Sequence, residues 1–167
     1  MSGLEALYAV LARPDFSPCA GCTACCEGAW LHAEEAGRAR ALDPASVVEE
    51  EGVAFLGAGG RCPWLGAGGC GRYAARPLDC RLFPLDIVEH EGALWWCVFQ
   101  SCVKPAELAS RLVPLIDALE AALTPPLLAA FEEQIRVTKA RYPAYAAGAY
   151  GLVRALRPRA CDPLLGG

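Results

Sequence analysis

Two short blocks of cysteine residues limit the fold of this chain more than any other feature of its sequence. The first block reads Cys19-Ala-Gly-Cys22-Thr-Ala-Cys25-Cys26, and the second, over residues 62–84, contains Cys62, Cys70 and Cys80. Thiols spaced this closely, with small residues between them, are typical of a thiolate-bound metal centre, because the backbone must approach the sulfur atoms. The chain is therefore expected to bring the thiols of two distant loops together.

The spacing within the first block favours iron over zinc. Cys19, Cys22 and Cys25 follow the C-x-x-C-x-x-C pattern of iron–sulfur proteins, whereas zinc sites more often pair two separated C-x-x-C units. Adjacent side chains point to opposite sides of an extended chain. We therefore expect either Cys25 or Cys26 to bind the ion, while the other serves a second ion or packs in the core. An iron–sulfur cluster such as [4Fe-4S] is predicted, with Zn²⁺ as the alternative.

One further cysteine would permit two four-cysteine sites. Cys102 supplies an eighth thiol, whereas Cys161, in a tail rich in Pro and Gly, is expected to be a bystander. The predicted metal ligands are Cys19, Cys22, Cys25, Cys26, Cys62, Cys70, Cys80 and Cys102.

Other side chains near the blocks are expected to support the site rather than to bind the ion. Positive charge to compensate the thiolates is expected from Arg72, Arg76 and Arg81. Shielding of the centre from water is expected from Trp64, Trp95 and Trp96. Loop capping is the expected role of Asp79 and Asp86.

These motifs together resemble the YkgJ-type family of small cysteine-cluster proteins, described as carrying a zinc- or iron-chelating domain. The first block fits the family's C-x-x-C-x-x-C-C signature, and Glu34-Glu35-Ala36 fits the acidic helix start that follows. The later motifs are matched by Cys62-Pro-Trp-Leu and by Cys70-Gly-Arg-Tyr-Ala-Ala-Arg76-Pro77-Leu-Asp-Cys80-Arg81-Leu-Phe-Pro84. The resemblance covers about residues 19–84 and implies metal binding at the matched cysteines, but no settled activity. His32 replaces the usual Ser or Thr before the acidic helix, and we expect it to act as the N-cap or to lie at the surface rather than to bind the ion.

Composition excludes several classes of partner. The 167 residues suit one domain, and the net charge of −4 argues against nucleic acid, which requires a concentrated basic surface.

The N-terminus lacks the features of a signal peptide, and no apolar run reaches the length of a membrane span. The protein is therefore predicted to be cytoplasmic. The chain has no asparagine and a single methionine, so a hyperthermophilic source with intracellular disulfides stays open as an alternative.

The periodicity of apolar residues predicts a mainly α fold with irregular metal-centred cysteine loops and one short β-hairpin, a small α+β protein. Residues 1–103 are predicted to form the cysteine-cluster domain, and residues 104–167 a helical extension packed on it. The hairpin is predicted from Leu85–Val88 and Ala93–Phe99, with a loop over residues 57–84. Helices are predicted over residues 4–11, 34–42, 44–51, from Pro105 with a break at Pro114, 124–142 and 145–156.

The sequence therefore predicts a metal-binding cysteine-cluster protein with a redox or electron-transfer role. A non-catalytic, zinc-stabilised interaction module that presents its C-terminal helices to a protein partner is the alternative. A third possibility is a protein held together by disulfides without bound metal. No residue outside the cysteines nominates a substrate, so enzymatic activity is left open.

Overall fold

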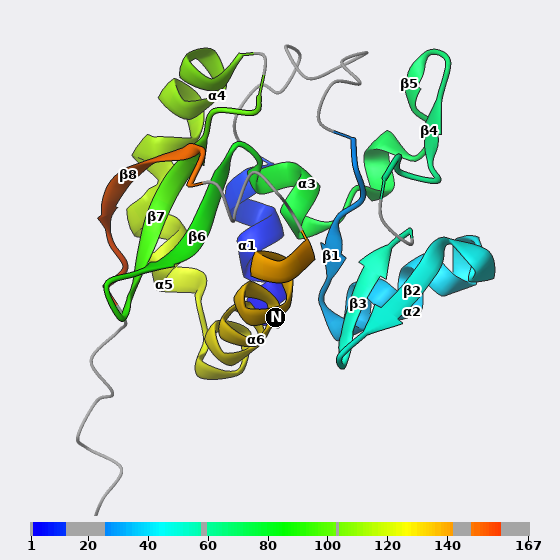
Figure 1. Ribbon diagram of the computed structural model, residues 1–167, viewed down its shortest axis with the longest axis horizontal. Helices are drawn as coiled ribbons and strands as arrows, with labels where there is room; N and C mark the ends of the chain where they lie inside the picture. The colour runs from blue at the N-terminus through cyan, green and yellow to red at the C-terminus, as the bar shows by residue number, and fades with distance from the viewer. Residues whose placement is uncertain (1, 13–25, 58–59, 103, 142–147, 158–167) are drawn as a thin grey trace, which may run out of the picture.

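The computed structural model describes residues 2–12, 26–57, 60–102, 104–141 and 148–157. Together they form a small α+β fold (Figure 1). The α-helices are α1 (Gly3–Leu11), α2 (Ala33–Leu42), α3 (Leu78–Leu82), α4 (Pro105–Leu112), α5 (Ile116–Ala122) and α6 (Pro125–Arg141). The strands are β1 (Trp30–Leu31), β2 (Val47–Glu50), β3 (Val53–Leu56), β4 (Leu65–Gly66), β5 (Gly69–Cys70), β6 (Leu85–His90), β7 (Ala93–Phe99) and β8 (Tyr150–Ala155). Short 3₁₀ turns are η2 (Pro44–Ser46), η3 (Tyr73–Ala75) and η4 (Val113–Leu115).

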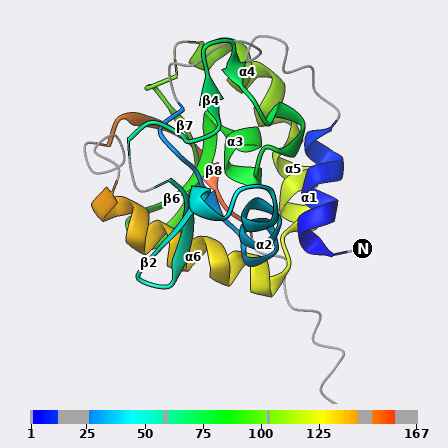
Figure 2. The ribbon, with the colours of Figure 1, turned by 90° about the vertical axis from the view of Figure 1, so that its right-hand side faces the viewer.

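The strands form three small antiparallel sheets. The described residues therefore contain more β structure than the single hairpin that was predicted. Their strand orders are β1-β3-β2, β4-β5 and β6-β7-β8. The β6-β7-β8 sheet lies on one side of α1 and α3, and the β1-β3-β2 sheet lies with α2 on the other side (Figure 1). Turning the molecule by 90° shows α1 alongside α5, with which it packs (Figure 2).

One main hydrophobic core joins these layers. Its fully buried side chains include Leu7 of α1, Phe55 of β3 and Trp96 of β7. Leu119 of α5 and Phe131 of α6 complete the same cluster, and the ring of Phe131 lies 5.0 Å from that of Trp30. The core thus draws side chains from both sides of residue 103, while the predicted division of the chain at that point stays a prediction.

Local sequence signals explain the helices that were predicted correctly. Ser2 and Glu5 form a capping box at the start of α1, which satisfies two backbone donors reciprocally. Pro105 occupies the first turn of α4, where a missing N–H costs nothing. Pro114 separates α4 from α5 as a 3₁₀ turn, and the predicted hairpin is present as β6 and β7.

The helix predicted over residues 44–51 was wrong, because this segment forms an antiparallel hairpin with the residues that follow it. Val47 pairs with Leu56 and Glu50 with Val53. Glu51 and Gly52 have φ values of 49° and 84°, the positive values that a tight two-residue hairpin turn requires. Glu49, Glu50 and Glu51 therefore end a strand rather than a helix.

The last predicted helix, over residues 145–156, was also wrong for its described part. Tyr150–Ala155 forms β8, which pairs antiparallel with β7. Polar contacts fix it to α5: Arg154 donates to Glu120 at 2.8 Å, and the Arg157 N–H donates to Glu120 at 3.1 Å. The buried Glu120 carboxylate also accepts a 2.9 Å bond from the Trp96 indole. A strand that depends on such distant partners gives little signal of its own in the sequence.

The predicted loop over residues 57–84 contains regular structure at its C-terminal end. Leu78 and Leu82 are both buried on α3, and β4 pairs with β5 earlier in the segment.

Among the described residues, no single helix combines the length and the apolar composition of a membrane span, although the bent pair Pro105–Ala122 and Pro125–Lys139 satisfies that test.

Gly28 offers a first test of the fold, because it stands next to Ala29, whose carbonyl binds the N–H of Leu56. Gly28 has a φ of +96°, and a Cβ atom there would lie 2.5 Å from the carbonyl oxygen of Leu56. We expect Gly28→Ala to lower the free energy of unfolding by about 3 kcal/mol. Gly37→Ala is the matched control, since nothing lies within 4 Å of its Cβ position in α2, and it should stabilise by about 1 kcal/mol. Equal effects in urea denaturation would contradict this account.

Candidate metal centre

The backbone brings the end of the first cysteine block to the start of the second. The N–H of Cys62 donates to the carbonyl of Cys26 at 2.9 Å. The carbonyl of Cys62 in turn accepts from the N–H of Leu65 at 3.1 Å, which forms a tight turn around Cys62. The two motifs, 36 positions apart in the printed sequence, are therefore neighbours in space.

The β4-β5 hairpin returns Cys70 towards Cys62. Leu65 is the strand partner of Cys70. Burial raises the pKa of the Cys62 thiol; the backbone of Trp64 opposes this rise, and the charge of Cys70 adds to it. Both cysteines pack against a second hydrophobic cluster that contains Leu31, Leu56 and Trp64.

Cys80 reaches the same region from α3. Burial is the main reason that the pKa of the Cys80 thiol lies well above its usual value, and the charges of Asp79 and Cys62 raise it further. The charge of Arg76 lowers this pKa, and that of Cys26 raises it. Cys26, Cys62, Cys70 and Cys80 thus come from three segments into one region, where the charge of Cys70 raises the pKa of Cys62, and the charges of Cys62 and Cys26 raise that of Cys80.

The donor chemistry of these four cysteines fits zinc or iron. Ionised thiols in one partly buried region repel one another, and a bound cation removes that cost. Sulfur is the ligand that both zinc and iron–sulfur centres prefer. As placed, no three His, Cys, Asp or Glu side chains of the described residues stand close enough to hold an ion. The predicted ligands Cys19, Cys22 and Cys25 lie outside the described residues, so the metal-centred loops stay a prediction.

The remaining cysteines lie in other surroundings. Cys97 is fully buried in the main core on β7, where it pairs with Asp86 of β6. Cys102 lies between β7 and α4, and its sulfur accepts a hydrogen bond from the N–H of Lys104 at 3.4 Å. The contacts that join the four gathered cysteines do not include Cys102, and its predicted role as a ligand stays a prediction. Cys161 lies outside the described residues.

The predicted shield of tryptophans is divided between two clusters. Trp64, 8% exposed, packs beside Cys62 and Cys70, as expected for a side chain that keeps water from a metal centre. Trp96 instead lies in the main core and binds Glu120, and Trp95 packs against that same core. The shielding role predicted for Trp95 and Trp96 was therefore wrong, because β7 places both side chains against the main core, Trp96 at Glu120 of α5 and Trp95 beside the ring of His90.

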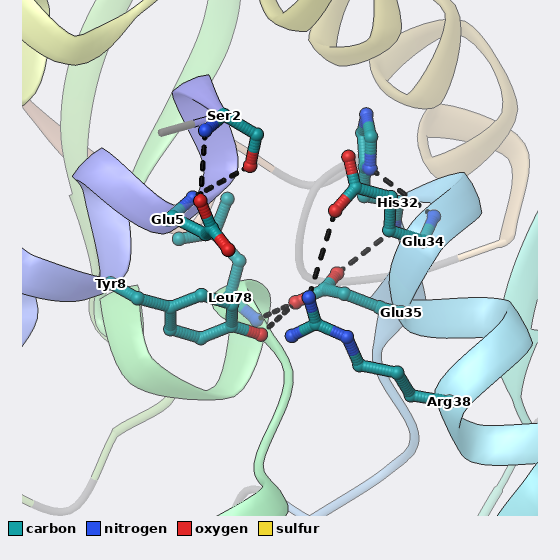
Figure 3. A network of polar contacts seen from close by, with 8 residues as sticks. All are labelled: Ser2, Glu5, Tyr8, His32, Glu34, Glu35, Arg38 and Leu78. Atoms are coloured by element: carbon teal, nitrogen blue, oxygen red, sulfur yellow. Dashed lines mark hydrogen bonds and ion pairs between the residues drawn. The ribbon is translucent and has the colours of Figure 1, made fainter.

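Glu35 is a structural residue of this region that sequence reasoning missed. It is 4% exposed, and its carboxylate accepts hydrogen bonds from the Tyr8 hydroxyl, from the Leu78 N–H at 2.6 Å and from the His32 N–H at 2.9 Å. Figure 3 shows these donors converging on Glu35 from α1, α3 and the start of α2. His32 caps α2, as predicted. The spacing of His32 and Glu35 is that of a capping box, and this spacing is the sequence signal from which a structural role of Glu35 could have been predicted.

The tyrosine in this network stays protonated. Burial raises the pKa of Tyr8 far above its ordinary value, and the charge of Glu35 and the hydrogen bond to it act in the same direction. Tyr8 therefore acts as the hydrogen-bond donor to Glu35. The network fixes α3, and with it Cys80, relative to α1 and α2.

Asp79 and Asp86 do more than cap loops. The Asp79 carboxylate accepts a 3.1 Å hydrogen bond from the N–H of Trp30, which links α3 to β1. Asp86 accepts a 2.7 Å bond from the N–H of Ile87. Burial raises the pKa of Asp79, and the charge of Asp86 adds to that rise; burial also raises the pKa of Asp86 to about 7.

Comparison with known proteins agrees with the cysteine pattern. Residues 18–99 match a family whose description is "CxxCxxCC: Putative zinc- or iron-chelating domain". No curated protein and no solved structure gives a significant match. The resemblance predicted from the two cysteine blocks is thereby confirmed, and the match supports binding of zinc or iron by this part of the chain.

Proposed function

Because residues 18–99 belong to the CxxCxxCC family, we propose that this protein binds an iron–sulfur cluster through its clustered thiolates and uses it to carry electrons. The observation that supports the proposal is that Cys26, Cys62, Cys70 and Cys80, from three segments of the chain, lie in one region: a backbone hydrogen bond joins Cys62 to Cys26, the charge of Cys70 acts on the Cys62 thiol, and the charge of Cys62 acts on the Cys80 thiol. An all-sulfur donor set suits iron–sulfur clusters and structural zinc sites alike, and the C-x-x-C-x-x-C spacing of Cys19, Cys22 and Cys25 is what favours iron. We also propose that this function is cytoplasmic, where thiols remain reduced.

Protein groups around the thiols suit such a centre. A cluster held there would accept and release one electron at a time. Arg76 contributes positive charge beside Cys80, which favours the thiolate form. Trp64 and the apolar side chains around it limit the access of water to Cys62 and Cys70. Burial and charge are the properties by which a protein tunes a reduction potential.

Anaerobic purification followed by elemental analysis tests this proposal. We expect iron and acid-labile sulfide in the purified protein, together with a broad visible absorption band that dithionite bleaches. Reversible bleaching would support an electron-carrying role. Zinc without sulfide, and no redox response, would contradict it.

A zinc-stabilised interaction module is the second candidate. It is favoured by β8, the outer strand of its sheet, on which Leu152 and Val153 are 39% and 37% exposed, because an exposed strand edge can pair with another chain. A chelator would then unfold the cysteine region without any redox signal. The third possibility, a disulfide-held protein, is not favoured, since Cys62, Cys70, Cys80, Cys97 and Cys102 form no disulfide in the described structure.

A further inference from the structure

A cleft of about 510 Å³ lies between α1, α2 and the segment that leads through η3 into α3. Its volume is in the range of sites for small organic molecules. We propose that this cleft binds a small organic carboxylate with an apolar body. The site is separate from the cysteine ligands, although Trp64 and Arg76 border both regions, and the proposal holds whichever metal the cysteines bind.

The ionic side chains of the cleft favour an anion. Its lining contains three guanidinium groups, those of Arg38, Arg76 and Arg81, and two carboxylates, those of Glu5 and Glu35. Both carboxylates already have donors: Glu5 accepts from the N–H of Ser2 at 2.9 Å, and Glu35 accepts the three hydrogen bonds described above. Positive charge therefore exceeds negative charge across the lining, three groups against two, and both carboxylates already accept hydrogen bonds from neutral donors.

Arg81 is held in place for such a role. Its Nε donates to the carbonyl of Arg76 at 2.8 Å, and one terminal nitrogen donates to the carbonyl of Ala74 at 2.8 Å. The guanidinium lies over the ring of Tyr8, 4.7 Å from its centroid. Its other terminal nitrogen has no hydrogen-bond partner among the described residues. A guanidinium fixed in this way loses little side-chain freedom when it binds a carboxylate.

Arg38 supplies a second guanidinium from α2. Figure 3 shows it reaching towards the Tyr8–Glu35 pair, and its charge lowers the pKa of Tyr8, as that of Arg81 does. Its ion pair with Glu34 is long, at 3.6 Å, and both side chains are about half exposed. Such a pair contributes little stability, so an incoming carboxylate can compete for Arg38.

The remaining lining is apolar and fits the body of the ligand. Leu31, Ala39, Leu42 and Pro77 form much of the wall. Trp64 also lines the cleft, and its indole N–H is buried without a hydrogen-bond partner among the described residues. An apolar wall with a few convergent polar groups is the usual composition of a small-molecule site.

Three probes with one apolar body and different head groups test the proposal: octanoate, octanol and octylammonium. Isothermal titration calorimetry should use the full-length protein, purified with its metal. We expect octanoate to bind about tenfold more tightly than octanol, and octylammonium to bind more weakly than octanol. Arg38→Gln should remove most of the preference for octanoate and leave the metal content unchanged.

Arg40→Gln is the matched control, because Arg40 lies on the same helix, binds Glu49 and is outside the lining. It should keep the preference of the unmodified protein for octanoate. Equal affinities for the three probes, no binding of octanoate, or an equal loss in both arginine variants would each overturn the proposal. None of these results bears on the metal analysis, so the two proposals can fail separately.

Discussion

Cys80→Ala is expected to release most of the bound metal. Cys80 lies on α3 in the same region as the other three cysteines, and the charges of Cys62 and Cys26 both raise the pKa of its thiol. Removing one thiolate from a metal centre leaves a coordination position without its ligand, and metal binding is coupled to folding in such sites. The measurement is the ratio of iron or zinc to protein after anaerobic purification, together with thermal unfolding with and without a chelator.

Cys97→Ala is the control for this experiment, because it removes a fully buried thiol from the main core rather than from the region of the other cysteines. It should retain the metal and lower the free energy of unfolding by about 1 kcal/mol. After Cys80→Ala, in contrast, a chelator should no longer change the unfolding temperature. Retention of metal by Cys80→Ala, or equal loss from both variants, would exclude Cys80 from the ligand set.

The helices whose ends are marked by proline could be predicted from the sequence. Pro105, Pro114 and Pro125 restrict where the backbone can enter or leave a helix, and all three act through their own ring geometry. The strand Tyr150–Ala155 could not be predicted in this way. Its position depends on the edge of β7 and on the buried carboxylate of Glu120, neither of which is visible in the local pattern.

For the candidate site, the structure shows that the two cysteine blocks are neighbours, while the ligand set stays a prediction. The spacing of the cysteines predicts that Cys62 and Cys80 belong with the first block, because closely spaced thiols are typical of a thiolate-bound metal centre. The backbone contact between Cys62 and Cys26 agrees with that expectation. The role of Glu35 was not predicted, because acidic residues at the start of a helix are usually solvated. Glu35 is buried because α1, which is distant in the sequence, places Tyr8 against it.

Glu35→Ala should destabilise the protein more than any other single change outside the cysteines proposed here. The substitution leaves the Tyr8 hydroxyl and the N–H groups of Leu78 and His32 without their shared acceptor. Each unsatisfied buried donor carries a substantial cost, so we expect the free energy of unfolding to fall by about 4 kcal/mol. Glu35→Gln keeps an acceptor oxygen and should cost about half as much. Urea denaturation monitored by tryptophan fluorescence measures both.

Glu34→Ala provides the comparison within the same helix turn. Glu34 is half exposed, and its ion pair with Arg38 is long, so its loss should cost only about 0.5 kcal/mol, mainly through the helix dipole. If Glu35→Ala also lowers the free energy of unfolding by only about 0.5 kcal/mol, water must reach the donors of Tyr8, Leu78 and His32. The hydrogen bonds to Glu35 would then not be what fixes α3. If the large difference is found, the position of Cys80 depends on a carboxylate contributed by α2, and Glu35→Ala should weaken metal retention even though Glu35 contacts no cysteine in the described network.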